Sequence, residues 1–368
     1  MTLLRIFIPI LSYPSCLKRI YRNFVALLKE VSKNSPNMTQ NTAKLNNFLL
    51  KVEKLSTFFP IKRRLFGRAA GYIKAVDNVS FGIRKGQTFG LVGQSGCGKT
   101  SVAKSLVKLV PAAAGRVLFD DTDVFSADSN QLKQLRSQIS IIFQDPYSSL
   151  NPRMTIGYVI GEPLKIHKKI TGSELTDRVA ALLAKVGLSP EYVNRYPHEL
   201  SGGQRQRIGI ARALALEPKL VICDEPVSSL DVSIQAHILN LLKDLQAEYG
   251  LTFLFIAHDL AVVEFFCDVV AVMYMGRIVE QAAVQELYHN PLHPYTRSLM
   301  SAIPQVEPEK HGQRTTFGGE VPSLLNLPAG CAFGPSCFLA DGNCMHKMPQ
   351  LEQKAGAEGH FVACWECQ

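Results

Sequence analysis

The residues of this sequence best suited to chemistry begin with a glycine-rich loop. The stretch "GQSGCGKT", residues 93–100, matches the G-x-x-x-x-G-K-[ST] pattern of a phosphate-binding loop. It follows an apolar strand pattern and precedes a helical one, which is the context that this motif requires. Its glycines let backbone N–H groups turn toward phosphates, and the helix N-terminus adds partial positive charge. The loop therefore predicts a site for ATP with Mg²⁺.

Two side chains of this loop have individual roles. Lys99 is expected to contact the β- and γ-phosphates, and Thr100 is expected to ligate Mg²⁺. We interpret Cys97 and the later Cys223 as small packing residues, because phosphoryl transfer needs no thiol there. The loop residues expected to bind the nucleotide are Gly93, Ser95, Gly96, Cys97, Gly98, Lys99, Thr100 and Ser101.

A second set of polar residues follows other apolar runs. In "LVICDEP" two acids emerge at the end of a predicted buried strand, where Asp224 would hold Mg²⁺ through water and Glu225 would orient or deprotonate the attacking water. Such acids can also cap the next helix, but the upstream phosphate loop favours catalysis. Gln144 can reach the Mg²⁺ or the water, and His258 can contact the γ-phosphate. A lone glutamine or histidine there is by itself uninformative, because structural hydrogen bonding explains it equally well.

A second glycine-rich helix start lies at "HELSGGQRQRIGIARAL", residues 198–214. Ser201 is a suitable N-cap, and the glycines expose backbone donors, so this helix start is a second potential anion-binding site. One ATP cannot occupy both seats in a compact monomer if each approaches the γ-phosphate from an opposite side. A two-fold partner solves this geometry, because each subunit's second seat can close over the nucleotide of the other.

The ordered motifs "GCGKT", "FQDP", "LSGGQ", "VICDEP", "SSLD" and "AHD" resemble the ATP-binding subunits of ABC transporters over roughly residues 48–290. In that family two subunits sandwich two ATP molecules head to tail. The resemblance implies that Ser201, Gly203 and Gln204 serve the site of the opposite subunit, and that residues 228–231 contact it. The family also stacks an aromatic residue on the adenine, for which Tyr72 and Phe66 compete.

Finer features narrow this resemblance. The stretches "IIFQDPYSSLNPRMTIG" and "NPLHPYTRSLMSAIP" are similar to the oligopeptide/dipeptide importer ATPases, and "FPIKR" to the second of their two paired ATPases. The resemblance implies ATP hydrolysis that powers peptide import. It also implies a related ATPase subunit and two transmembrane permease subunits as partners. An extracytoplasmic solute-binding protein would act indirectly, and the chain would lie at the cytoplasmic face of the membrane.

The last part of the chain is rich in cysteine. Five of the nine cysteines lie in the last 38 residues. This segment is loop-like and its own core is small, so it needs a cross-link or a bound metal to be stable. Four thiolates suit Zn²⁺ or a [4Fe–4S] cluster, and a cytosolic disulfide is unfavourable. Some of the similar importer ATPases carry a [4Fe–4S] cluster in this tail, which favours a cluster over zinc or free thiols. The expected ligands are Cys331, Cys337, Cys344 and Cys364.

Strand patterns alternate with helical ones, which favours a doubly wound α/β sheet. We expect a P-loop, ABC-type nucleotide-binding domain over residues 48–290, with an inserted α-helical subdomain at about 150–205. A small cysteine-rich extension follows over 291–368. Residues 1–47 are expected to be a poorly ordered N-terminal extension, whose first 37 residues are either a basic amphipathic segment or the product of a gene start placed upstream of Met38.

Composition bounds the remaining alternatives. An apolar fraction of 46% supports a sizeable core, and no run reaches the ~18 apolar residues of a membrane-spanning helix. The formal charge of +9 lends slight support to a soluble ABC ATPase that acts on nucleic acid or ribosomes. Such proteins commonly join two ATPase units, whereas this chain shows one copy of each motif, so no nucleic-acid partner is expected. Other solutes, such as nickel or glycosides, remain open, as does a redox or metal-assembly role for the cysteines.

Overall fold

The computed structural model describes residues 48–61, 71–145, 147, 149–302, 324–325 and 327–367. The expected N-terminal extension and Phe66, the alternative adenine contact, lie outside these residues. Among the helices of the described ranges, none combines the length and the apolar character that crossing a membrane requires.

The main sheet of the described residues has eight strands in the order β11-β12-β10-β9-β3-β8-β7-β6. Strands β9, β3, β8, β7 and β6 run parallel, and β10 joins β9 as an antiparallel hairpin. The parallel strands are short apolar runs because both faces of the sheet are covered. The strands of the main sheet are β3 (Thr88–Val92), β6 (Ile139–Ile142), β7 (Leu220–Asp224), β8 (Thr252–Ala257), β9 (Val269–Tyr274), β10 (Arg277–Ala283), β11 (Glu352–Gln353) and β12 (Phe361–Val362).

A second, antiparallel sheet has the order β2-β1-β4-β5. Its strands are β1 (Phe48–Pro60), β2 (Tyr72–Arg84), β4 (Ala114–Phe119) and β5 (Thr122–Asp123). The sequence pattern predicts a doubly wound α/β sheet, and this separate antiparallel sheet is not part of that prediction. Strand β4 lies between β1 and β5. The second sheet packs on the main sheet rather than joining it, and apolar residues of β1, β2 and β4 share one buried core with those of β3 and β8.

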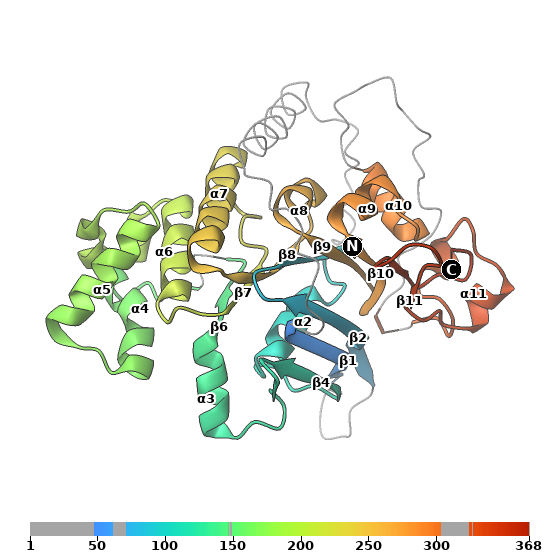
Figure 1. Cartoon of the computed structure of the whole chain (residues 1–368), viewed down its shortest axis with the longest axis horizontal. Coiled ribbons are helices and arrows are strands. Elements are labelled where there is room, and N and C mark those ends of the chain that lie inside the picture. Colours follow the sequence, from blue (N-terminus) through green and yellow to red (C-terminus); the bar gives the residue numbers. More distant parts are fainter. Residues whose placement is uncertain are drawn as a thin grey trace, which may run out of the picture.

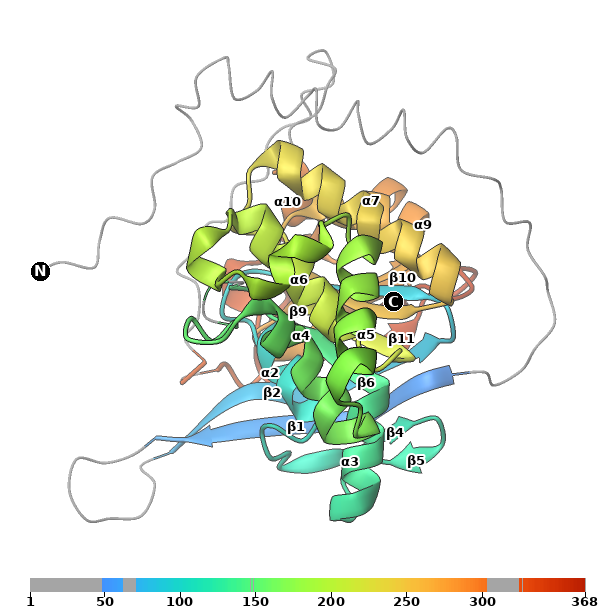
Figure 2. The same cartoon turned by 90° about the vertical axis from the view of Figure 1, so that its left-hand side faces the viewer.

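Helices cover the sheets in layers. In Figure 1, α7, α8, α9 and α10 lie above the main sheet, and β1, β2 and β4 lie below it; Figure 2 shows the same layering. Helix α2 packs against β1, β2 and β7, and so fills the space between the two sheets. The bounds of these helices are α2 (Lys99–Leu106), α3 (Ser129–Gln138), α7 (Val232–Tyr249), α8 (Leu260–Phe266), α9 (Val284–His289) and α10 (Pro294–Ser301).

Two hydrophobic cores occupy the two faces of the main sheet. Alternate residues of β8 point to opposite faces, so that Phe253 and Phe255 join the core under the helices while Leu254 and Ile256 join the core that faces the second sheet. All four side chains are fully buried. This two-sided burial makes β8 and its neighbours the rigid base on which the loops at the strand ends are mounted.

The segment between β6 and β7 is helical and lies at the left end of Figure 1. It comprises α4 (Ile156–Pro163), a π-helical turn η2 (Leu164–Lys168), α5 (Gly172–Lys185), the short 3₁₀ turns η3 (Pro190–Asn194) and η4 (Pro197–Glu199), and α6 (Gly202–Leu214). The C-terminal segment lies at the opposite end, with η6 (Gly334–Ser336) and α11 (Gly342–His346), and β12 extends the main sheet by pairing with β10.

Candidate functional site

The carboxyl ends of four neighbouring parallel strands meet at one edge of the main sheet. Each strand leads into a residue that the sequence motifs single out: β3 into Gly93, β8 into His258, β7 into Glu225 and β6 into Gln144. The ends are level, because the last strand residues are paired across the sheet. The Cα pairs are Val92 with Ala257, Ile256 with Asp224, and Cys223 with Ile142. Ligands of open α/β sheets bind at this edge.

The phosphate loop turns sharply between β3 and α2. Gly93 and Gly98 have φ angles of +151° and +112°, which side-chain-bearing residues rarely adopt. A Cβ atom at Gly93 would lie 2.1 Å from the carbonyl oxygen of Met273, and one at Gly98 would lie 2.0 Å from that of Ala75. Close approach to the neighbouring backbone therefore requires glycine at both positions.

Helix α2 begins at Lys99, and no side chain caps its N-terminus. Its first backbone N–H groups are thus available to an anion. The Lys99 side chain is buried, and its Nζ donates to the carbonyl oxygens of Gly93 at 2.7 Å and Gln94 at 3.1 Å. The ammonium therefore folds back onto the loop, at the place where phosphates are expected to bind. Gly96 and Ser95 lie at the exposed turn of the loop, and Ser101 lies half-buried in the first turn of α2.

Thr100 and Asp224 bring two oxygen ligands together. The Thr100 hydroxyl donates to Oδ1 of Asp224 at 3.1 Å. Burial raises the pKa of Asp224 and the charge of Glu225 raises it further, while the Thr100 bond and the charges of Lys104 and Lys99 oppose this. Hydroxyl and carboxylate oxygens are ligands that Mg²⁺ prefers, so this pair fits the metal predicted from the motifs. A bound cation would favour the ionised form of Asp224.

Glu225 lies between two of the predicted site residues. Gln144 Nε2 donates to its Oε2 at 2.8 Å, and His258 Nδ1 lies 3.2 Å from the same oxygen. Glu225 also has a left-handed backbone conformation, with φ +49°, held by its N–H donating to the carbonyl of Ile256. A non-glycine residue in this region is uncommon and is often found at functional sites. The orientation of the carboxylate thus depends on residues that follow three different strands, β6, β7 and β8.

The second glycine-rich helix start forms a complete capping box on α6. Ser201 Oγ accepts from the N–H of Gln204, and Gln204 Oε1 accepts from the N–H of Ser201. Gly203 packs so closely on α7 that an added Cβ would lie 2.7 Å from Cγ2 of Ile234. Within the described residues the hydrogen bonds of Ser201 stay inside α6. Ser201 is exposed, whereas Gln204 is half-buried and Gly203 is buried.

Tyr72 opens β2 and its side chain is 60% exposed, so its ring is available for stacking. The two cysteines of the nucleotide-binding motifs are buried, and burial raises the pKa of both thiols. Cys97 and Cys223 are therefore neutral thiols, in line with their interpretation as packing residues.

The four cysteines predicted to bind a cluster line one pocket of the C-terminal segment, together with His293, Phe333 and Trp365. Burial raises the pKa of Cys331, and it raises the pKa of Cys344 to about 11. Their thiols are the donor type of a [4Fe–4S] cluster. However, in the part of the chain that the structure describes, no group of three or more Cys, His, Asp or Glu side chains is placed to hold a metal ion. The cluster therefore stays a prediction.

Two contacts at this site are not predicted by the sequence motifs. The hydroxyl of Tyr295, in α10, accepts a hydrogen bond at 3.1 Å from the N–H of Gln94 in the phosphate loop. Ser228 Oγ donates to the backbone carbonyl of Glu225 at 3.1 Å, which ties the start of the loop at 228–231 to the backbone of Glu225. The only available signal for Tyr295 is the stretch "NPLHPYTRSLMSAIP", which gives a likeness but no role.

Comparison with known proteins agrees with this geometry. The family described as "ABC transporter" matches residues 76–228, and the family described as "Oligopeptide/dipeptide transporter, C-terminal region" matches residues 279–344. The oligopeptide transport ATP-binding protein AppF of Bacillus subtilis is 47% identical over 328 residues, covering 88% of this chain and 98% of AppF. The oligopeptide transport ATP-binding protein OppF of Salmonella typhimurium is 50% identical over 321 residues, covering 86% of this chain and 95% of OppF.

Among solved structures, the chain is similar to the ATP-binding cassette MJ0796 in a dimeric, post-hydrolysis state bound to ADP and Pi. The TM-score is 0.57 at 27% identity, covering 64% of this chain and 98% of that chain. The likeness therefore extends over a complete cassette and leaves about a third of the present chain outside it.

Proposed function

The chain belongs to the ABC transporter ATPases of the oligopeptide/dipeptide import family, and from this premise we propose that it hydrolyses ATP to drive oligopeptides through a membrane ABC permease. The observation that carries the proposal is the convergence of Gln144, Glu225 and His258 beside the phosphate loop, in a chain that aligns with oligopeptide transport ATP-binding proteins over nearly their whole length.

The proposed chemistry follows from positions at the strand ends. Backbone N–H groups of the loop and Lys99 bind the phosphates, and Tyr72 stacks on the adenine. Thr100 and Asp224 would hold Mg²⁺, with Gln144 as a further ligand, and the bound metal would neutralise phosphate charge. Glu225 orients the attacking water and accepts its proton, while His258 holds the γ-phosphate. The left-handed backbone of Glu225 and its two side-chain neighbours support this role.

The site is proposed to be completed by a second ATPase subunit. Ser201, Gly203 and Gln204 would approach the γ-phosphate bound by the partner subunit, because a helix N-terminus attracts negative charge. The dimeric, nucleotide-bound state of the similar cassette supports this arrangement. The partner is a related chain, because the resemblance is to one of a pair of ATPases. ATP binding would close the pair and hydrolysis would reopen it.

The permease partners are proposed from the relatives and from the helical segment between β6 and β7. We propose that this segment acts as the inserted α-helical subdomain, and that the surface between it and Gln144 is the docking place for a short helix of the permease. The ATPase thus works peripherally, at the cytoplasmic face of the membrane. The extracytoplasmic solute-binding protein affects it only through the permease.

The C-terminal segment is proposed to carry a [4Fe–4S] cluster with a structural role, held by the four cysteines that line its pocket. Support comes from the shared pocket and from the resemblance to importer ATPases with such a tail. Iron and sulfide analysis of the purified full chain tests the assignment, with zinc or metal-free thiols as the results that would overturn it.

The central experiment is Glu225→Gln in the assembled transporter. The change keeps the shape of the side chain but removes its basicity, so ATP hydrolysis should fall by about 10²-fold or more while ATP binding is retained. The variant should therefore accumulate as a closed, ATP-bound complex that no longer imports peptide. The control is Glu248→Gln, at the exposed end of α7. Parental hydrolysis by Glu225→Gln would refute the role of Glu225. If the parental transporter imports a solute but its import does not depend on peptide, the proposed cargo is wrong.

A further inference from the structure

A buried tyrosine outside the known nucleotide motifs touches the phosphate loop. Tyr295 is 2% exposed and lies in the first turn of α10, and its hydroxyl accepts from the N–H of Gln94. The same Gly93–Gln94 peptide unit is bound at its other end, where Lys99 Nζ donates to the carbonyl oxygen of Gly93. The peptide plane that starts the loop is therefore held from both sides.

The hydrogen bonds from Lys99 and Tyr295 to this peptide differ in whether a bound nucleotide competes with them. An ammonium has three donors, and Lys99 directs two of them at carbonyls of the loop and the third at Sγ of Cys97, 3.9 Å away. Donation by Lys99 to a phosphate competes with those bonds. The Tyr295 hydroxyl serves the N–H side of the peptide and is independent of the ammonium, so it can keep the loop in place when Lys99 turns to a nucleotide.

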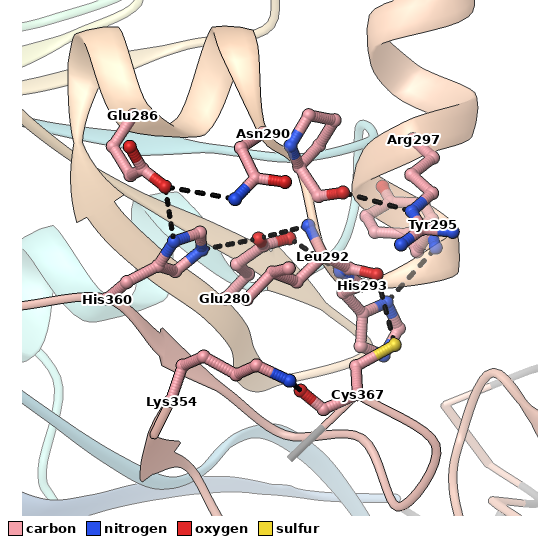
Figure 3. Close-up of polar contacts among 11 residues, drawn as sticks. Glu280, Glu286, Asn290, Leu292, His293, Tyr295, Arg297, Lys354, His360 and Cys367 are labelled. Atoms are coloured by element: carbon pink, nitrogen blue, oxygen red, sulfur yellow. Dashed lines mark hydrogen bonds and ion pairs between the residues drawn. The ribbon is translucent and has the colours of Figure 1, made fainter. Parts of the chain in front are cut away.

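The position of Tyr295 is itself fixed by the chain that precedes it. His293 caps α10, because its Nδ1 accepts from the N–H of Tyr295 at 3.0 Å. Burial lowers the pKa of His293 to about 4, so the ring is neutral and can accept. The N–H of His293 in turn donates to the fully buried carboxylate of Glu280, at 3.0 Å (Figure 3).

The C-terminal segment contacts the same carboxylate. His360 Nε2 lies 2.8 Å from Oε1 of Glu280, and Figure 3 shows Glu280 between His360 and the backbone of Leu292. Phe333, from the cysteine-lined pocket, packs with its ring centroid 5.6 Å from that of Tyr295. Buried contacts thus run without a break from the C-terminal segment through His293 and Tyr295 to the phosphate loop.

We propose that Tyr295 is a positioning residue for the phosphate loop, and that His293, the N-cap of α10, holds Tyr295 in position. The segment after the ATPase motifs thereby tunes nucleotide affinity. The proposal rests on the proposed function only in that the loop binds nucleotide phosphates. Removing one neutral hydrogen bond weakens an interaction by about three- to tenfold. Tyr295→Phe should therefore weaken ADP binding to the full chain by that factor.

The test compares Tyr295→Phe with Tyr274→Phe by calorimetric titration of each full-length chain with ADP. Tyr274 is buried in the same aromatic cluster, with ring centroids 4.5 Å apart, so it is a matched loss of one hydroxyl. In Tyr295→Phe alone, hydrogen–deuterium exchange should speed up at the Gln94 amide. In the assembled transporter the KM for ATP should rise by the same factor, with kcat changed less than about twofold.

A second pair of variants tests the cap. His293→Ala removes the acceptor for the Tyr295 N–H and should weaken ADP binding as Tyr295→Phe does, whereas His293→Asn retains an N-cap acceptor and should restore it. Parental affinity and unchanged Gln94 exchange in Tyr295→Phe would overturn the proposal. Parental affinity in His293→Ala would overturn the part assigned to the cap. If the parental chain itself fails to bind ADP, the proposed function fails instead.

Discussion

Gln144 donates a hydrogen bond from Nε2 to Oε2 of Glu225 at 2.8 Å, although the two residues follow different strands and lie 81 positions apart. The amide therefore faces the carboxylate with its donor and orients Glu225, and Nδ1 of His258 lies 3.2 Å from the same oxygen. A change at Gln144 should accordingly be felt through the ionisation of Glu225.

Gln144→Glu places a second carboxyl group against Glu225. Like charges disfavour joint ionisation, so the apparent pKa of the pair should rise and the acid limb of the ATPase pH profile should move to higher pH. Turnover at neutral pH should fall roughly tenfold to hundredfold. The control is Gln134→Glu on α3, which adds the same charge at an exposed position. An unmoved acid limb would show that the two side chains are uncoupled during turnover.

Ser201→Ala removes the side-chain acceptor of the capping box on α6. Loss of such a cap costs about 1 kcal/mol of stability, which thermal unfolding measures. Ser201→Asn keeps a capping side chain and should recover that stability, but its bulk should still disturb the seat for the γ-phosphate of the partner subunit. ATP-dependent pairing of the two ATPase subunits should therefore be weak in both variants. Normal pairing in Ser201→Asn would contradict the shared site.

His360 makes stability depend on pH. Burial lowers its pKa, but the hydrogen bond and charge of Glu280, with a further contribution from Glu286, raise the pKa overall above the ordinary value of 6.5. A raised pKa in the folded state means that protonation stabilises the fold, fully below pH 6.5 and progressively less as pH rises through the folded-state value. The unfolding temperature of the parental chain minus that of His360→Gln should thus shrink as pH increases from 6.5.

The matched control for this pH series is His289→Gln, at the exposed end of α9. Its difference from the parental chain should stay constant across the same pH range. A His360→Gln difference that grows with pH would mean that the ring is neutral in the folded protein, and the assigned ion pair with Glu280 would be wrong.

The cysteine pocket gives a prediction that separates one of its lining cysteines, Cys344, from Cys367, which does not line it. Cys344→Ser should remove iron and sulfide from the purified chain and lower its unfolding temperature, because Cys344 lines the pocket. Cys367→Ala should retain both, because the Cys367 thiol instead donates to the carbonyl of Leu292. Visible absorbance and metal analysis of the two variants check this. Equal metal content in both variants would exclude the proposed ligand set.

The sequence by itself predicted features that depend on short stretches of chain. The phosphate loop at 93–100 needs only a strand, a set of glycines and a helix start, and each is recognisable within a few residues. The apolar runs that became β3, β7 and β8 were likewise visible, because a strand buried on both faces leaves a continuous apolar run. The capping role of Ser201 was also local, since the cap and its donor are three residues apart.

What the sequence could not predict is set by strand order and by contacts between distant residues. Gln144, Glu225 and His258 become neighbours because β6, β7 and β8 lie side by side, an order that depends on the packing of the whole sheet. The separate antiparallel sheet arises in the same way, from burial of one face of β1 and β2.

Tyr295 shows the limit most clearly. It is 201 residues from Gln94, and its hydroxyl reaches the phosphate loop only because α10 packs where β10, His293 and the C-terminal segment place it. Motif spacing encodes which atoms a loop presents, because backbone geometry is local. The partner that steadies the loop was decided by the tertiary structure alone, because a single buried hydrogen bond leaves no periodicity in the chain.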